Sequence, residues 1–187
     1  MNSQKILSII YFEDEKRSVS KRWRRTHDYH DQEVIRMTEE IELRIGEMEI
    51  TNSKGILTAR ALGSCVAVAI YDRQNEVGGM AHVLLGNGKR KKEGRSCMYA
   101  DEAVENLIKG IISKGGRKRN LKAKIAGGAS MFSSTSAGKI GKKNVKTVRR
   151  ELEDRNIPIE GEDIGGTHAR NVRFKVGSMS MKVEVKI

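Results

Sequence analysis

Two residues of reactive type, Cys65 and His82, lie in short apolar segments that are close together in the chain. Cys65 follows Gly63 and Ser64, two small residues that favour a tight turn, and His82 lies in the run GGMAHV at 78–83. A thiolate nucleophile and a nearby imidazole base are the minimum set of catalytic groups for nucleophilic attack on an amide or an ester. The alternative is a buried free cysteine and a structural histidine, and these two residues alone do not decide between them.

The segments that carry these residues have the pattern of a β-hairpin. Residues 66–71 alternate between larger and smaller apolar side chains, residues 77–85 form a second apolar run, and the intervening residues are polar. Because side chains alternate with period two, an odd sum of paired residue numbers places Cys65 and His82 on the same face. At a sum of 147 they are directly opposite, with Cβ atoms roughly 5 Å apart, and at 149 they are diagonal, roughly 7–8 Å apart. An even sum separates them.

Length and composition exclude several classes of protein. The 187 residues suit one domain with an extension. The two cysteines, Cys65 and Cys97, do not form a CxxC pair, and the four histidines do not form an HExxH pattern. We therefore expect a reduced, cytoplasmic protein without a metal ion or another cofactor. No apolar run approaches the roughly 18 residues of a membrane span, so we expect no membrane insertion.

The formal net charge of +12 indicates an acidic partner, either a protein surface or a nucleic acid. Basic residues cluster at 89–92, at 117–119 and between 142 and 150. Aromatic residues make up only 4% of the chain, which argues against stacking on nucleic-acid bases. We therefore expect no nucleic-acid partner.

The chain divides into an N-terminal extension at 1–40, expected to be disordered or partly helical, and a folded domain at 41–187. Met37 is a plausible alternative start. Apolar periodicity predicts helices over 100–112 and about 141–155, the second capped by Asn144 if it begins later. Strands are predicted near 56–61, 66–71, 77–85, 121–126, 157–159, 172–176 and 180–187. This pattern predicts a layered α/β (α+β) fold.

Seven short motifs, in order, resemble those of one family, the chemoreceptor glutamine deamidases known as CheD. None is specific alone, but together they span about residues 43–187. They are Ile45-Gly46-Glu47, LGSCVAV at 62–68, GMAHV at 79–83, Tyr99-Ala100-Asp101, GGASMF at 127–132, Ile140-Gly141 with Asn144-Val145, and EDIGG at 162–166 with Arg170.

The resemblance implies hydrolysis of glutamine side chains to glutamate, with release of ammonia, in methyl-accepting chemotaxis receptors. Cys65 would be the nucleophile and His82 the general acid and base, and we expect the turn at Gly63 and Ser64 to bind the oxyanion. The implied fold is a mainly antiparallel or mixed β-sheet with flanking helices, similar to cysteine-dependent deamidating toxin domains. The implied partners are the receptors and a CheC-type phosphatase, with the chain a monomer or a heterodimer with CheC.

One departure from the family concerns the residue that orients the histidine. Family members usually have a threonine six residues before the cysteine, and here that position is Ala59. Thr58 points to the opposite face of a regular strand, although a β-bulge would bring it into place. Otherwise a backbone carbonyl or another side chain orients His82, or the protein is a weakly active or inactive binding regulator of CheC and receptors.

Three further residues in the matching motifs are candidates for a substrate or partner surface. They are Tyr99, Asp101 and Arg170. The alternative is that they order the start of the first helix and the turn near 165–170.

Overall fold

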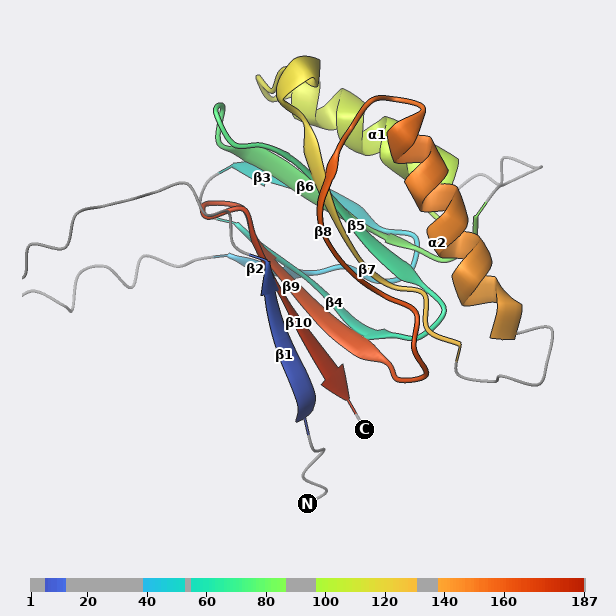
Figure 1. The fold of residues 1–187 in the computed structure, drawn as a ribbon. Helices are drawn as coiled ribbons and strands as arrows, with labels where there is room; N and C mark the ends of the chain where they lie inside the picture. Colours follow the sequence, from blue (N-terminus) through green and yellow to red (C-terminus); the bar gives the residue numbers. More distant parts are fainter. Residues whose placement is uncertain (1–5, 13–38, 53–54, 87–96, 131–137, 187) are drawn as a thin grey trace, which may run out of the picture.

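Two five-stranded sheets and two helices form three layers (Figure 1). The computed structural model describes residues 6–12, 39–52, 55–86, 97–130 and 138–186. The outer sheet has the order β1-β10-β9-β4-β2, and the central sheet has the order β3-β6-β5-β7-β8. All neighbouring strands are antiparallel except for two parallel pairs, β2 with β4 and β7 with β8. The structure therefore confirms the predicted layered fold with mixed sheets.

The elements have the following bounds. The outer sheet contains β1 (Ile6–Phe12), β2 (Glu40–Glu42), β4 (Ile56–Leu62), β9 (Arg170–Lys175) and β10 (Ser180–Lys186). The central sheet contains β3 (Met48–Asn52), β5 (Val66–Asp72), β6 (Val77–Val83), β7 (Lys122–Gly127) and β8 (Ile159–Ile164). The helices are α1 (Ala100–Ser113) and α2 (Gly138–Glu153), with a short 3₁₀ helix at Lys118–Asn120.

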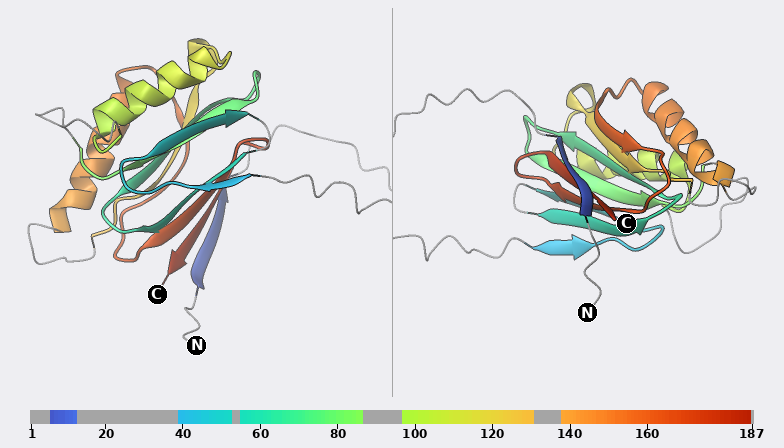
Figure 2. Two further views of the ribbon diagram at one scale, coloured as in Figure 1. Left: turned by 180° about the vertical axis from the view of Figure 1, so that it is seen from behind. Right: turned by 60° about the horizontal axis from the view of Figure 1, so that its bottom comes forward.

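The central sheet is covered on both faces, which explains the continuous apolar character of β5 (Figure 2). Val66, Val68 and Ile70 belong to the core that the helices cover, while Ala67 and Ala69 belong to the core between the sheets. The amphipathic faces of α1 and α2 close the first core with residues such as Leu107, Val148 and Leu152. Side chains from β4, β9 and β10 close the second core.

Three chain connections cross between the two sheets at the same end of the molecule. Residues 43–47 join β2 to β3, residues 63–65 join β4 to β5, and residues 165–169 join β8 to β9. β6 and β7 also end there, because β5 begins at this end and is antiparallel to both of them. Cys65 and His82 therefore lie at the end of the molecule where the chain crosses between layers.

The structure differs from the sequence-based expectations in several places, and β2 and β3 were not predicted. Residues 6–12 were predicted to be disordered or helical, but they form β1 and pair with β10. The strand predicted near 157–159 begins at Ile159 and continues to Ile164. Asn144 lies inside α2 and does not cap it, because the helix begins at Gly138. Residues 1–5 and 13–38 of the predicted extension, with Met37, lie outside the described residues, Glu40 begins β2, and the boundary at 40 stays a prediction.

Candidate active site

The turn that carries Cys65 is shaped by an irregularity at the end of β4. The pairing of β4 with β9 shifts between Ala59 and Leu62, and Ala61 has a positive φ of 53°. The backbone N–H of Ala61 donates to the side chain of Asn171 (3.0 Å), which satisfies a donor that the irregular pairing leaves free. A β-bulge of this kind bends a strand and redirects the side chains that follow it. The chain then turns through Gly63 and Ser64 into β5.

The glycine segment after β7 supports this turn from the side. The Cys65 carbonyl accepts from the N–H of Gly128 (2.7 Å), and the Gly63 carbonyl accepts from the N–H of Ala129 (2.8 Å). Gly127 has a φ of 117°, and a Cβ at this position would lie 2.3 Å from the Cys65 carbonyl oxygen. Glycine is therefore required for the close approach of the two backbones.

The register of β5 and β6 places Cys65 and His82 on the same face. Ala67 pairs with His82 and Val66 with Val83, so paired residue numbers sum to 149. This is the diagonal arrangement of the two predicted odd registers, and it directs both side chains to the space between the sheets. Cys65 is 7% exposed and His82 is 4% exposed. The predicted hairpin is confirmed, and it brings the two residues to one place.

The crossing segment at 43–47 holds His82 by three hydrogen bonds. The Nδ1 atom of His82 lies 3.1 Å from the Leu43 carbonyl oxygen. The His82 N–H donates to the Glu47 carbonyl (2.9 Å), and the His82 carbonyl accepts from the N–H of Gly46 (2.8 Å). Because a carbonyl only accepts, the neutral ring must carry its proton on Nδ1. The Nε2 atom then has a free lone pair, and it is buried without a hydrogen-bond partner.

Burial keeps the cysteine and histidine neutral as a pair. Burial raises the pKa of the Cys65 thiol, an effect partly offset by its own backbone N–H. Burial also lowers the pKa of His82, and the Leu43 carbonyl and the charge of Glu47 offset this only in part. At neutral pH the site therefore holds a thiol and an imidazole whose Nε2 is ready to accept a proton.

Thr58 does not reach His82, and its predicted catalytic role is not supported by its position. Leu57 and Ala59 belong to the core between the sheets, so Thr58 points to the other face of β4. Its hydroxyl lies 3.4 Å from the Ile41 carbonyl, and its neighbours on that face include Arg173. The physical reason is that residues 56–59 pair regularly with β9, and the irregularity follows Ala59. The structure instead offers the Leu43 carbonyl as the group that orients the imidazole.

The predicted oxyanion turn is half-buried and has free donors. Gly63 and Ser64 are partly exposed. Within the described part of the chain, the N–H groups of Gly63, Ser64 and Cys65 donate no backbone hydrogen bond. Consecutive free N–H groups next to a nucleophile are suited to binding a developing negative charge.

The three surface candidates lie at the same end of the molecule, and two of them, Tyr99 and Arg170, make structural contacts. Tyr99 precedes α1 and forms a β-bridge with Leu85, just after β6. Asp101 lies in the first turn of α1, and its Oδ1 atom is buried without a hydrogen-bond partner. Arg170 is 5% exposed and pairs with Asp163 (3.1 Å), and it also donates to the His168 carbonyl. Their proposed contacts with substrate stay predictions.

Sequence reasoning missed the role of Asn144 at this site. Its side chain, 1% exposed, reaches from α2 to the carbonyls of Ser64 and Leu84. A polar residue on the buried face of an amphipathic helix was the available signal, since its neighbours Val145 and Val148 are apolar.

Comparison with known proteins identifies the family. The family model described as CheD chemotactic sensory transduction matches residues 84–186. A probable chemoreceptor glutamine deamidase CheD of Geobacillus kaustophilus is 41% identical over 150 residues, which cover 76% of this chain and 91% of that protein. This chain belongs to the CheD family. The CheD model begins two residues after His82, so the matched segment itself does not include the cysteine and histidine.

Other relatives support the same family, including a chemoreceptor glutamine deamidase CheD of Thermotoga maritima. That protein is 42% identical over 134 residues, which cover 71% of this CheD chain and 83% of the relative. Among solved structures, the hypothetical protein YfiH of Bacillus licheniformis gives a TM-score of 0.39 at 14% identity, covering 75% of this chain and 61% of that one. A likeness at this level adds nothing to the fold described above.

The described residues of this CheD chain form neither a cluster of metal-ligating side chains nor a membrane-spanning helix. No three histidine, cysteine or acidic side chains there come together as metal ligands. No helix in those residues has the length and apolar character that crossing a bilayer requires.

Proposed function

We propose that this protein is a cysteine-dependent amidohydrolase that converts glutamine side chains of methyl-accepting chemotaxis receptors to glutamate. The observation that carries the proposal is the free Nε2 atom of His82, buried on the same face as Cys65 while Nδ1 is held by the Leu43 carbonyl. Membership of the CheD family, whose curated members are named chemoreceptor glutamine deamidases, supports the choice of substrate.

The proposed reaction begins with transfer of the Cys65 thiol proton to Nε2 of His82. The sulfur attacks the amide carbon, and the N–H groups of the 63–65 turn bind the resulting oxyanion. When the tetrahedral intermediate collapses, the C–N bond breaks and His82 returns its proton to the departing ammonia. Water, deprotonated by His82, then attacks the thioester carbon, the C–S bond breaks, and His82 returns the proton to the Cys65 sulfur as glutamate is released. One water is consumed for each ammonia released.

The Cys65 and His82 side chains are not hydrogen-bonded to each other in this structure. Catalytic hydrogen bonds are often long in the free enzyme and tighten when substrate binds. The absence of the usual threonine at Ala59 is compatible with this mechanism, since a backbone carbonyl fixes the same tautomer that a threonine hydroxyl would fix.

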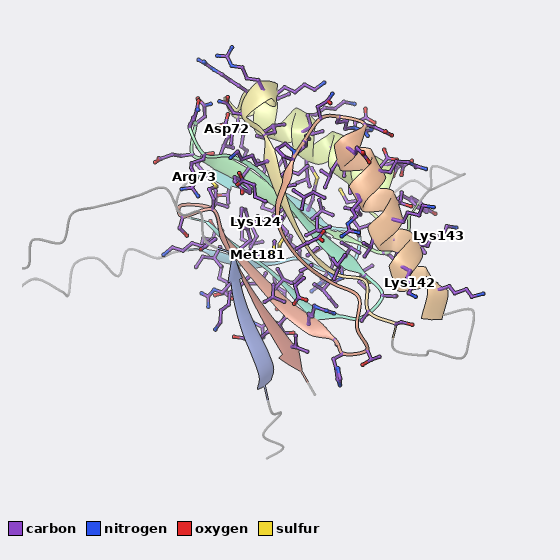
Figure 3. All side chains as sticks on the ribbon, viewed as in Figure 1. Asp72, Arg73, Lys124, Lys142, Lys143 and Met181 are labelled. Carbon is purple, nitrogen blue, oxygen red and sulfur yellow. The ribbon has the colours of Figure 1, made fainter. Side chains whose placement is uncertain are left out.

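Receptors and a CheC-type phosphatase are the partners in this proposal, and the cytoplasm, where receptor glutamines are exposed, is its location. The basic surface of α2 supports binding to an acidic partner. Lys142 and Lys143 are exposed near the N-terminal end of this helix (Figure 3). Electrostatic attraction of this kind raises association rates and weakens as salt is added.

The experiment measures ammonia release and the mass increase of about 1 Da per converted glutamine on a purified receptor cytoplasmic fragment. Wild type is compared with Cys65→Ala and with Cys97→Ala, since Cys97 is the other cysteine and is buried in the core on the helix side of the central sheet rather than between the sheets. We expect activity in wild type and Cys97→Ala and none in Cys65→Ala. Wild type that modifies none of several receptors would overturn the enzyme proposal in favour of a binding regulator, which a CheC pull-down would then test.

A further inference from the structure

One buried side chain ties together the ends of the two strands that carry Cys65 and His82. The Asn144 amide nitrogen donates to the carbonyls of Ser64 (2.9 Å) and Leu84 (2.7 Å), so both of its hydrogens are used. Ser64 directly precedes Cys65, and Leu84 lies two residues after His82. The orientation of the amide is determined by these contacts, because the flipped amide would place its oxygen against two carbonyl oxygens.

The local preferences of a helix do not explain this asparagine. Its Oδ1 atom is buried without a hydrogen-bond partner, which is unfavourable in a folded protein. Asparagine is also a poor helix former, and the residue lies inside α2 among apolar neighbours. What it provides is a pair of donors for two strand-end carbonyls, one of which belongs to the peptide bond between Ser64 and Cys65.

The geometry of that peptide bond fixes a second group. In a planar trans peptide the C=O and the following N–H point in opposite directions. Since the Ser64 carbonyl points to Asn144 on α2, the N–H of Cys65 points away from the helix. In the described part of the chain this N–H donates to no backbone carbonyl, and it lies close enough to its own sulfur to favour the thiolate. It is therefore free to donate to a substrate oxygen at the sulfur.

We propose that Asn144 is a positioning residue that fixes the Ser64–Cys65 peptide so that the Cys65 N–H faces the oxyanion formed on the substrate. The inference rests on the proposed deamidase function of Cys65. It assigns Asn144 no contact with substrate, because its side chain is buried.

The first test follows the Cys65 amide directly by NMR. The chain has only two cysteines, so ¹⁵N-cysteine labelling gives two amide signals, and Cys65→Ala identifies which one belongs to Cys65. Asn144→Leu removes both donors while nearly conserving volume, and Asn144→Ala is a second variant. Thr147→Val is the matched control, since Thr147 is another buried polar residue of α2 whose hydroxyl donates within the helix to the Lys143 carbonyl. We expect the Cys65 signal to move in both Asn144 variants and to stay in place in Thr147→Val.

The second test separates the oxyanion from the nucleophile. Iodoacetamide alkylates the thiol without forming an oxyanion, whereas deamidation forms one. In the Asn144 variants we expect kcat to fall tenfold or more, with KM and the alkylation rate of Cys65 each within about threefold of wild type, because misaligning one donor costs part of the roughly 10²–10³-fold effect of removing it.

Each outcome decides the inference. An unmoved Cys65 signal in both Asn144 variants overturns it, and so does a parallel loss of kcat and alkylation, which would mean that Asn144 sets the cysteine–histidine pair. A wild type that deamidates no receptor fragment refutes the proposed function, while the NMR comparison still decides whether Asn144 orients the Cys65 amide.

Discussion

Replacing Gly141 with alanine tests how closely α2 must approach the nucleophile. A Cβ at Gly141 would lie 2.4 Å from the Gly128 carbonyl oxygen and 2.6 Å from that of Ala129. Carbon and oxygen atoms in close contact are separated by about 3.3 Å, so the helix must move by about 0.9 Å. Gly128 and Ala129 cannot yield easily, because their N–H groups donate to the carbonyls of Cys65 and Gly63.

The displacement of the helix is sufficient to break the contacts of Asn144, one turn further along α2. Its hydrogen bonds of 2.9 and 2.7 Å would lengthen to about 3.6–3.8 Å, beyond the range of an N–H···O bond. Overpacking costs about 1–3 kcal/mol, and the better helix propensity of alanine returns up to about 1 kcal/mol. We therefore expect Gly141→Ala to lose about 1–2 kcal/mol of stability and about tenfold in kcat.

Thermal unfolding and the receptor deamidation assay measure the two effects. A loss of 1–2 kcal/mol lowers Tm by about 2–8 °C in a domain of this size. Gly110→Ala is the control, since this glycine is also helical but its Cβ would meet only the flexible end of the Ile50 side chain. If Gly141→Ala raised Tm, as helix propensity alone predicts, and left kcat unchanged, the close approach of α2 would have no consequence and the reasoning would be wrong.

Three further substitutions test other parts of the site. Glu47→Gln removes a charge that raises the pKa of His82, so the acid limb of the kcat/KM profile, which already lies below about pH 6.5, should move to lower pH. Arg170→Met leaves Asp163 without its buried partner and should cost about 3 kcal/mol in urea unfolding. Thr58→Val changes the face of β4 that points away from the site, so kcat should stay within about twofold of wild type in the deamidation assay.

Matched variants accompany the first two of these substitutions. Glu49→Gln removes the next acidic residue along the chain, and an equal shift of the acid limb there would contradict a specific effect of Glu47. Arg173→Met breaks an exposed ion pair with Glu40, which should cost no more than about 1 kcal/mol. A large loss of kcat in Thr58→Val would show that Thr58 reaches the site after all.

The hairpin with Cys65 and His82 could be predicted because its information is local. Alternation within 66–71 and 77–85 fixes which side chains of each strand share a face, but the register of the two strands, odd or even, was left open and is set by the structure. Helix α1 was predicted for a similar reason, since its apolar residues recur at helical spacing. The arrangement of the strands in two sheets was harder to predict from the sequence, because β2 has only three residues, too few to show an alternating pattern.

The supporting contacts could not be predicted, because they join side chains to backbone atoms far away in the sequence. His82 Nδ1 bonds a carbonyl 39 residues away, and Asn144 bonds carbonyls 80 and 60 residues away. Every residue type has a backbone carbonyl, so no sequence pattern indicates that Leu43 or Ser64 accepts these hydrogen bonds. Thr58 was a candidate because it lies one residue before Ala59 and a β-bulge could shift it into place, but the irregularity in the structure follows Ala59 and leaves Thr58 on the other face.

The crossings between the sheets have a mechanical consequence for the nucleophile and its base. Cys65 lies in the 63–65 crossing, and His82 is held by the 43–47 crossing, so each is attached to both sheets. The hairpin register sets the spacing of Cys65 and His82 within the central sheet, while the two crossings tie the turn at Cys65 and the support of His82 to the outer sheet. Side chains in the core between the sheets, such as Met80 and Phe174, set the separation of the two sheets without contacting the site. A change in the thickness of this layer would therefore move the two crossings, and with them the turn that carries Cys65 and the carbonyl that orients His82.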